Sequence, residues 1–397
     1  MSDARHLAGA ALADALRDSR ARTGSLVDDL SDAQWQPPQR PGVNPIAWEL
    51  AHLAWFAEFW VLRGPHGRDA HGHATAREPA RFAGPDATFD SARLAHAARW
   101  ATPMPNRDAL ARMLAEQLDA CIAALPTRSG DEHADDAALY FHRLALFHED
   151  MHGEAFCWLR ASTGAGAPRG VSLPRVGTAL PIAVRGGAFR HGTGADDSGF
   201  AFDNERPGRE VKLADFEIDS APVSAAAFAR FVDAGGYDDP ALWPGPAGAW
   251  RAASALAHPQ RWRRAGREGR GDWEQRWFDC WLPLEPRSPA IHVNAFEAEA
   301  YCRWAGRRLP SAAEWEAAAP QIAWGHSVWE WTADAFAPCP GFTPGPYREY
   351  SAPWFGDHRE LRGGAFATHA RLHDRRYRNF FEPQRTDIFA GFRSVSR

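Results

Sequence analysis

The chain has 397 residues, of which 45% are hydrophobic and 24% are charged, a composition typical of globular proteins and long enough for two domains. Its formal net charge of −5 argues against nucleic acid or an anionic membrane as a partner. The five cysteines are scattered, and neither a signal peptide nor a membrane span is visible. We therefore expect a cytoplasmic protein with reduced thiols, either a monomer or a weak homodimer.

Four segments in the first part of the chain have helical periodicity: 4–30, 46–63, 107–125 and 131–162. We expect Asn44 to cap the second helix with Pro45 at its first position, and Asn106 to cap the third. An irregular stretch at 65–105 separates these two helices, and loops of that length are usually functional or mobile. The pattern predicts a four-helix bundle whose core can hold a metal.

The fourth segment contains two histidines four residues apart, His148 and His152, which share one helix face and can bind one metal ion. Glu154 is turned about 200° away from His152, so we expect it to support a ligand rather than to bind the metal. His52, on the aromatic face of the second segment, is the best-placed third ligand. The weaker candidates are His66, His71, His73, His133 and His142.

The same residues allow other interpretations. The run His148–His152 matches the H-E-x-x-H signature of zinc hydrolases, with Glu149 as general base. Two histidines can also share a helix face by chance. Three neutral imidazoles leave open coordination positions, which suits a catalytic zinc or a non-haem iron, and spacing alone does not choose between them.

After a Gly- and Pro-containing linker at 163–170, short apolar runs alternate with turn residues, and tryptophans are frequent. The clear helical segments here are 224–233, 295–304 and 311–319. This pattern predicts a loop-rich α+β domain stabilised by aromatic packing.

Six motifs of this second half resemble the formylglycine-generating-enzyme-like domain, a C-type-lectin-like fold: AFDNERP at 201–207, PAIHVN at 289–294, AYCRWAGRRLPSAAEWE at 300–316, VWEWT at 328–332, LRGGAF at 361–366 and GFR at 391–393. The resemblance implies a DinB-like four-helix bundle at 1–165 followed by this domain at 171–397. Together with the bundle histidines, the chain resembles the ergothioneine-type sulfoxide synthases and their relative, selenoneine synthase.

The resemblance implies an iron(II) centre held by His52, His148 and His152. It implies an O2-dependent reaction that joins sulfur or selenium to C2 of the imidazole of hercynine, the trimethylated betaine of histidine. Tyr347 matches the catalytic tyrosine of the family, which supplies a proton or hydrogen atom. A different possibility is that the lectin-like half only binds sugar and the bundle is a scaffold.

Four further residues correspond to positions that contact hercynine. Tyr350 and Asn379 match residues that hold this substrate, and Phe380 falls where the family has an aromatic side chain beside the trimethylammonium group. Met151 stands where the family usually has a glutamine that hydrogen-bonds the substrate imidazole.

The departures from the family concern the chalcogen donor. Phe381 replaces an acidic residue that faces γ-glutamylcysteine, and Arg385 matches a substrate-contacting arginine without that acidic partner. A pocket with Trp100, Trp354 and these phenylalanines suits a neutral donor such as a selenosugar, because an unpaired ammonium group is costly. We therefore predict a selenoneine synthase, with a hercynine sulfoxide synthase that uses cysteine or γ-glutamylcysteine as the alternative.

Overall fold

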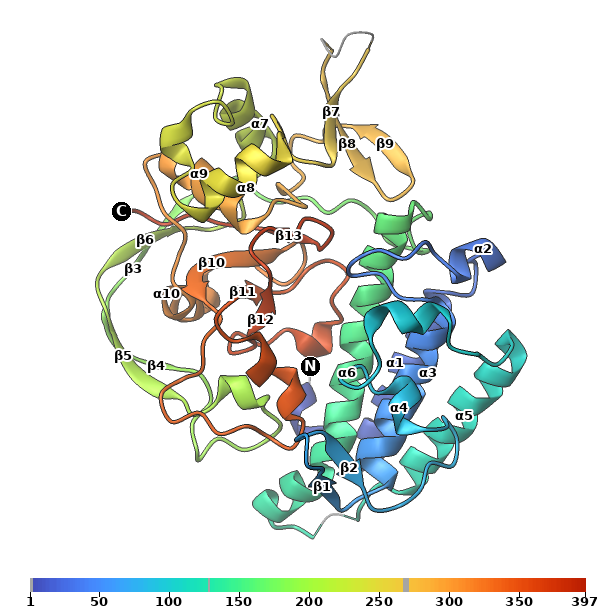
Figure 1. Cartoon of the computed structure of the whole chain (residues 1–397). Helices are drawn as coiled ribbons and strands as arrows, with labels where there is room; N and C mark the ends of the chain where they lie inside the picture. The colour runs from blue at the N-terminus through green and yellow to red at the C-terminus, as the bar shows by residue number, and fades with distance from the viewer. Residues whose placement is uncertain (1–2, 128, 267–270) are drawn as a thin grey trace. The chain divides into compact units, whose positions relative to one another are not determined.

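The computed structural model describes residues 3–127, 129–266 and 271–397, and the chain divides into two compact units (Figure 1). Unit 1 comprises Met1–Arg169, Asp196–Ala201 and Gly345–Glu349. Unit 2 comprises Gly170–Ala195, Phe202–Pro344 and Tyr350–Arg397. The domain boundaries predicted from the sequence placed Asp196–Ala201 and Gly345–Glu349 in the second domain, but both segments belong to unit 1. The second of these segments contains Tyr347.

Unit 1 is built on four long helices, and the predicted four-helix bundle is confirmed. They are α1 (Gly9–Ser25), α3 (Ile46–Ala57), α5 (Arg107–Ala123) and α6 (Glu132–Thr163). Figure 1 shows them packed side by side. The first predicted helix is shorter than expected, because a 3₁₀ turn at Ala4–His6 precedes α1 and the short helix α2 (Asp32–Trp35) follows it.

The helix caps explain where these helices begin. The side chains of Asn106 and Asp131 accept hydrogen bonds from the first-turn amides of α5 and α6, as Asn and Asp favour. The predicted cap at Asn44 is wrong: Pro45 is the N-cap residue of α3, and the Asn44 Oδ1 atom accepts a hydrogen bond of 2.8 Å from Arg99. The predicted second helix continues past α3 as a π-helical turn at Glu58–Leu62.

The stretch at 65–105 contains more regular structure than the sequence predicted. It forms the hairpin β1 (His66–Arg68) and β2 (Ala74–Ala76), the helix α4 (Asp86–Phe89) and a 3₁₀ turn at His96–Trp100. The Asp86 carboxylate anchors it to the bundle, because it accepts hydrogen bonds from Arg63 (2.6 Å) and Trp55 (2.8 Å).

Unit 2 is the expected loop-rich α+β domain of the formylglycine-generating-enzyme type. Its four-stranded sheet has the order β12-β11-β10-β13, from Asn379–Phe381, Arg359–Gly363, Trp329–Ala335 and Ala390–Gly391. The other strands are β3 (Pro181–Val184) with β6 (Phe216–Asp219), β4 (Gly187–His191) with β5 (Arg209–Leu213), and β7 (Trp262–Arg264), β8 (Trp273–Trp277) and β9 (Cys280–Pro283). The helices are α7 (Ala225–Asp233), α8 (Pro246–Ser254), α9 (Ala295–Trp304) and α10 (Ala312–Ala318).

Buried charges hold the centre of this domain. The Arg393 guanidinium lies against both carboxylate oxygens of Glu330, with 2.6 Å between Nη2 and Oε1, and both side chains are fully buried. The Trp315 indole N–H donates to the same carboxylate at 2.7 Å. This network ties the last residues of the chain to β10 and α10.

Two sequence-based expectations concern the environment of the chain. All five cysteines are free thiols, and four of them are at least partly buried. Across the described ranges, no helix combines the length and the apolar character needed to cross a membrane.

We predict that Arg393→Ala lowers the free energy of unfolding by about 3–5 kcal/mol, because it leaves the Glu330 carboxylate buried without its counter-charge. The control is Arg175→Ala, since Arg175 pairs with Glu285 at 2.7 Å but its side chain is 65% exposed. That change should stay within about 1 kcal/mol. Urea unfolding followed by tryptophan fluorescence measures both, and equal losses would contradict the prediction.

Candidate metal centre

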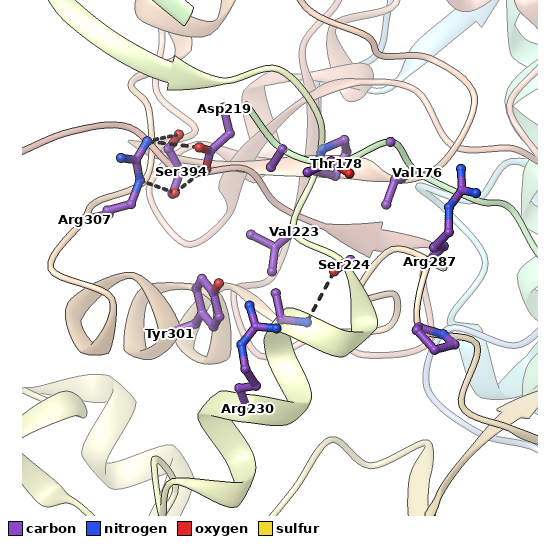
Figure 2. Close-up of a pocket in the computed structure, with 15 residues that line it drawn as sticks. Val176, Thr178, Asp219, Val223, Ser224, Arg230, Arg287, Tyr301, Arg307 and Ser394 are labelled. Atoms are coloured by element: carbon purple, nitrogen blue, oxygen red, sulfur yellow. Dashed lines mark hydrogen bonds and ion pairs between the residues drawn. The ribbon is translucent and has the colours of Figure 1, made fainter. Parts of the chain in front are cut away.

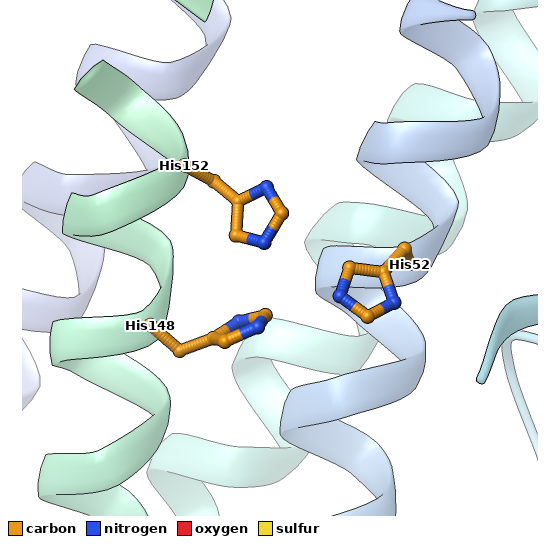
Figure 3. Close-up of side chains that lie close together, drawn as sticks. All are labelled: His52, His148 and His152. Atoms are coloured by element: carbon orange, nitrogen blue, oxygen red, sulfur yellow. The ribbon is translucent and has the colours of Figure 1, made fainter. Parts of the chain in front are cut away.

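Three imidazoles meet between helices α3 and α6 of unit 1. His52 comes from α3, and His148 and His152 come from consecutive turns of α6 (Figure 3). The His52 ring centroid lies 5.2 Å from each of the other two rings, which are themselves 4.5 Å apart. One nitrogen from each ring lies within 4.8 Å of the others, a spacing that could hold a metal ion.

Hydrogen bonds to the outer nitrogens orient two of these rings. The Nδ1 atom of His52 lies 2.7 Å from the Phe89 carbonyl oxygen, and the Nδ1 atom of His152 lies 2.9 Å from a Glu49 carboxylate oxygen. With Nδ1 engaged, Nε2 is the nitrogen left to face the centre in both residues. His148 is positioned by packing, since its ring stacks on Phe56 with centroids 3.5 Å apart.

Burial keeps the imidazoles of His52 and His148 uncharged. Desolvation lowers the pKa of His52 to about 3, and His152 lowers it further, whereas the hydrogen bond with Phe89 acts in the opposite direction. Desolvation also lowers the pKa of His148 well below its usual value, with His152 and His52 adding to the effect. Neutral imidazoles are the form that binds metal ions.

Glu49 is the functional candidate that the sequence interpretation missed. It lies three residues before His52 on α3, so helical spacing puts both on neighbouring parts of one face. Its side chain is only 2% exposed and contacts His152 through Nδ1. A carboxylate bound to the outer nitrogen of a metal-binding imidazole fixes its tautomer and raises its basicity.

Two other acidic residues near the histidine pair, Glu149 and Glu154, do not belong to the three-histidine group. Both carboxylate oxygens of Glu149 accept hydrogen bonds from Arg20 of α1, at 2.7 and 3.1 Å, which does not fit a general base beside the cluster. Glu154 is buried but is not part of the three-histidine group, so its supporting role stays a prediction.

The weaker histidine candidates also lie outside the group. The His66 ring bonds with the Phe59 carbonyl oxygen at 2.8 Å, and the His142 ring with that of Cys121 at 3.0 Å. His71 and His133 are exposed, and His73 is partly exposed.

Tyr347 lies within unit 1, close to the cluster. Its ring centroid is 4.9 Å from Phe56 and 6.3 Å from His148. Arg68 of the β1–β2 hairpin holds this segment, because it donates to the Pro346 carbonyl oxygen at 2.6 Å and forms an ion pair with Glu349. Burial raises the pKa of the Tyr347 hydroxyl, with Asp90 and Glu349 adding to the effect, so the phenol keeps its proton at neutral pH.

Two other predicted residues belong to unit 1. Met151 lies on α6 between His148 and His152 and is partly buried. Trp100 is also partly buried, and its indole N–H donates to the Pro37 carbonyl oxygen at 2.6 Å.

The predicted hercynine-contacting residues of unit 2 form an aromatic group around β12. Phe380 stacks on Phe336 with ring centroids 4.0 Å apart, and its amide donates to the Asn379 side chain at 2.9 Å. Tyr350 stacks on Phe202, and its hydroxyl donates to Tyr377 at 3.0 Å. Burial raises the pKa of the Tyr350 hydroxyl well above its usual value, and the neighbouring Tyr377 hydroxyl adds to this effect.

Arg385 has an acidic partner other than the family position at 381, where this chain has Phe381. Its guanidinium donates to both carboxylate oxygens of Asp387, at 2.8 and 3.0 Å. It also lies 4.8 Å from the centre of the Phe381 ring. The Arg385–Asp387 pair is neutral overall. Trp354 is 42% exposed and packs near His358.

The chain is similar to known proteins along most of its length. Residues 15–155 match the DinB superfamily, and residues 173–325 and 324–397 match the sulfatase-modifying factor enzyme 1-like domain. A hercynine oxygenase of Mycolicibacterium thermoresistibile is 32% identical, with 97% of this chain and 94% of the relative covered. One from Mycolicibacterium smegmatis is also 32% identical, with 96% and 97% covered. A formylglycine-generating enzyme of Thermomonospora curvata is 36% identical over 35% of this chain and 48% of its own length.

We predict that Glu49→Gln weakens binding of a divalent metal by about 10- to 100-fold, because the neutral amide no longer supports the basicity of His152. Competition with a chromophoric chelator measures the affinity. Glu154→Gln is the matched comparison, since it removes the neighbouring carboxylate that lies outside the histidine group. If Glu154→Gln weakened metal binding and Glu49→Gln did not, Glu154 rather than Glu49 would be the carboxylate that supports the metal site.

Proposed function

Because the chain belongs to the hercynine oxygenase family and combines a DinB superfamily bundle with a sulfatase-modifying factor enzyme 1-like domain, we propose that it is an iron(II)-dependent selenoneine synthase. It is an oxygen-dependent oxidoreductase, as its relatives indicate. The proposed reaction joins the selenium of a selenosugar to C2 of the hercynine imidazole, with O2 as the oxidant. The group of His52, His148 and His152, in which the first two residues are buried, is the observation that carries this proposal.

The donor set fits a catalytic iron. Three imidazoles from two helices could supply nitrogen ligands, and three protein ligands would leave coordination positions for small molecules. Glu49 and the Phe89 carbonyl oxygen fix the two Nδ1 atoms, so the ligand nitrogens are pre-oriented. When bound, iron(II) supplies the redox chemistry that activates O2.

Tyr347 is the proposed proton donor in unit 1. Its hydroxyl stays protonated because burial and two carboxylates raise its pKa. The ring is held by Phe56 and Trp60, at centroid distances of 4.9 and 5.8 Å, while Arg68 fixes the backbone beside it. A donor held in this way is positioned for general acid catalysis before substrate binds.

Within unit 2, we propose that Asn379 and Tyr350 supply polar groups for hercynine and that Phe380 supplies an aromatic face for the trimethylammonium group. Within unit 1, Met151 is the residue proposed to offer a weakly accepting thioether to the substrate imidazole, because it lies between His148 and His152 on α6.

The groups around 381 support a neutral donor. The Arg385 charge is balanced by Asp387, and Phe381 offers no counter-charge for an ammonium group. A γ-glutamylcysteine donor would bring an ammonium and two carboxylates, which need partners when desolvated. A sugar has apolar faces that stack on rings such as Phe381 and Trp354. The alternative remains a hercynine sulfoxide synthase that uses cysteine or γ-glutamylcysteine.

The central test compares three donors with one protein. The enzyme is loaded anaerobically with Fe(II), and O2 uptake is followed with hercynine and a selenosugar, cysteine or γ-glutamylcysteine. We expect uptake to require hercynine and to be fastest with the selenosugar, with a selenium isotope pattern in the product mass spectrum. His148→Ala and zinc-loaded enzyme should be inactive. Faster turnover of a thiol donor would establish the sulfur alternative, and no turnover with any donor would refute both.

We predict that Tyr347→Phe lowers turnover by about 10²- to 10⁴-fold, because it removes the proton donor while keeping the aromatic ring. Fe(II) affinity should be unchanged, which separates loss of chemistry from loss of the site. Tyr140→Phe is the control: Tyr140 packs on Phe200 in the same unit and should keep activity within about twofold. An unchanged turnover in Tyr347→Phe would exclude this role.

A further inference from the structure

A hollow lies entirely within unit 2, and its lining includes none of the metal-binding or substrate-contacting residues predicted above (Figure 2). Its volume is about 420 Å³, within the range of small-molecule sites. It is bordered by the segment before β3, the end of β6, and helices α7 and α9. The lining residues that the argument uses are Asp219, Ser224, Arg230, Arg287, Tyr301 and Arg307.

One wall of this pocket is electrostatically balanced. Arg307 donates to Asp219 Oδ1 at 3.2 Å and to the Ser394 hydroxyl at 2.6 Å, and that hydroxyl donates to Asp219 Oδ2 at 2.5 Å (Figure 2). The Asp219 carboxylate, which is the acidic group of the pocket lining, is thereby committed to Arg307 and Ser394. It does not neutralise the other cations.

Arg230 and Arg287 add two positive charges to the same pocket. Within the described parts of the chain, neither guanidinium is ion-paired with a carboxylate or engaged in a side-chain hydrogen bond. Glu285 is near enough for Arg287 to influence its pKa, but its carboxylate is bound by Arg175 at 2.7 Å. The pocket is therefore cationic in a chain whose formal net charge is −5.

The Tyr301 hydroxyl is a hydrogen-bond donor in the same pocket as these arginines. Its side chain is 9% exposed and packs between Phe228 and Phe392, with ring centroids 5.7 and 5.3 Å away. Its hydroxyl has no hydrogen-bond partner among the described residues, although the residue lines the pocket. Arg230 and Arg307 both act electrostatically on this hydroxyl. Burial raises its pKa to about 12, so the O–H remains a donor.

The N-terminus of α7 does not supply the binding groups. The Ala225 and Ala226 amides donate to the carbonyl oxygens of Ser288 and Pro286, and the Ala227 amide donates to the Ser224 hydroxyl. Recognition therefore falls to the side chains of Arg230, Arg287 and Tyr301.

We propose that this pocket is a binding site for a small organic anion, whose carboxylate or phosphate oxygens accept hydrogen bonds from Arg230, Arg287 and Tyr301. Apolar groups from Val176, Val223 and Ala227 line the space between them and accommodate the carbon part of the ligand. Two exposed guanidinium groups without internal partners, beside the unpartnered hydroxyl of a largely buried tyrosine, are a combination that can bind an anion. The site is independent of the metal centre and of the proposed reaction.

The test uses calorimetric titration of the iron-loaded protein with inorganic phosphate and with succinate, and with neutral succinamide as reference. We expect saturable binding of at least one anion and none of succinamide. Arg230→Gln should weaken that binding about tenfold or more, and Tyr301→Phe about threefold to tenfold. Preference for phosphate or succinate identifies the ligand group.

The matched control is Arg185→Gln, because Arg185 is an exposed arginine of the same unit outside the pocket and should leave the affinity unchanged. Absence of saturable binding to either anion would overturn the proposal. So would binding that Arg230→Gln and Tyr301→Phe leave intact, or that Arg185→Gln weakens equally. Far-ultraviolet circular dichroism of each variant verifies the fold, and Tyr301→Phe keeps the packed ring.

Discussion

The burial of the uncharged His52 and His148 imidazoles between α3 and α6 is the constraint on which the proposed chemistry of unit 1 depends. His52 and His148 are 3% and 5% exposed, so desolvation and mutual repulsion exclude the imidazolium forms. Each neutral ring carries an acceptor lone pair, and the two Nδ1 contacts turn the Nε2 atoms of His52 and His152 inward. Lone pairs that converge in a core repel one another and need a shared partner, which a metal cation provides.

Unit 2 uses buried charge for a different purpose, to fix a strand. Glu360 of β11 lies between the Arg362 and Arg378 guanidinium groups, at 2.7 and 2.9 Å. Burial opposes its ionisation, but these two arginines prevail and lower its pKa to about 2. Since Glu360 is paired with Phe380 across the β11–β12 ladder, the charged network sets the register of the strand that carries Asn379 and Phe380. The residues proposed to contact substrate on this strand are thereby held in position before substrate binds.

The sequence was informative where the determining interactions are local. Helical spacing predicted the His148–His152 pair, and the caps at Asn106 and Asp131 follow from side chains that bond to amides two or three residues away. It failed where distant residues decide. Asn44 does not cap its helix because Arg99, 55 residues later, occupies its oxygen. The membership of Tyr347 in unit 1 depends on Arg68 and Glu349, which are 281 residues apart. Glu49 could have been predicted from the sequence, because it precedes His52 by about one helical turn.

Under the proposed function, the groups around Phe381 determine which chalcogen donor is accepted. Arg385 is held by the Asp387 carboxylate and the Phe381 ring together, so each of the three restricts the other two. An acidic residue at 381 alone would place two carboxylates beside one guanidinium and leave the new charge incompletely compensated. Removal of Asp387 alone would take away the carboxylate that balances Arg385. We therefore propose that acceptance of a zwitterionic dipeptide requires both positions to change together, which is the non-additive behaviour expected of residues in direct contact.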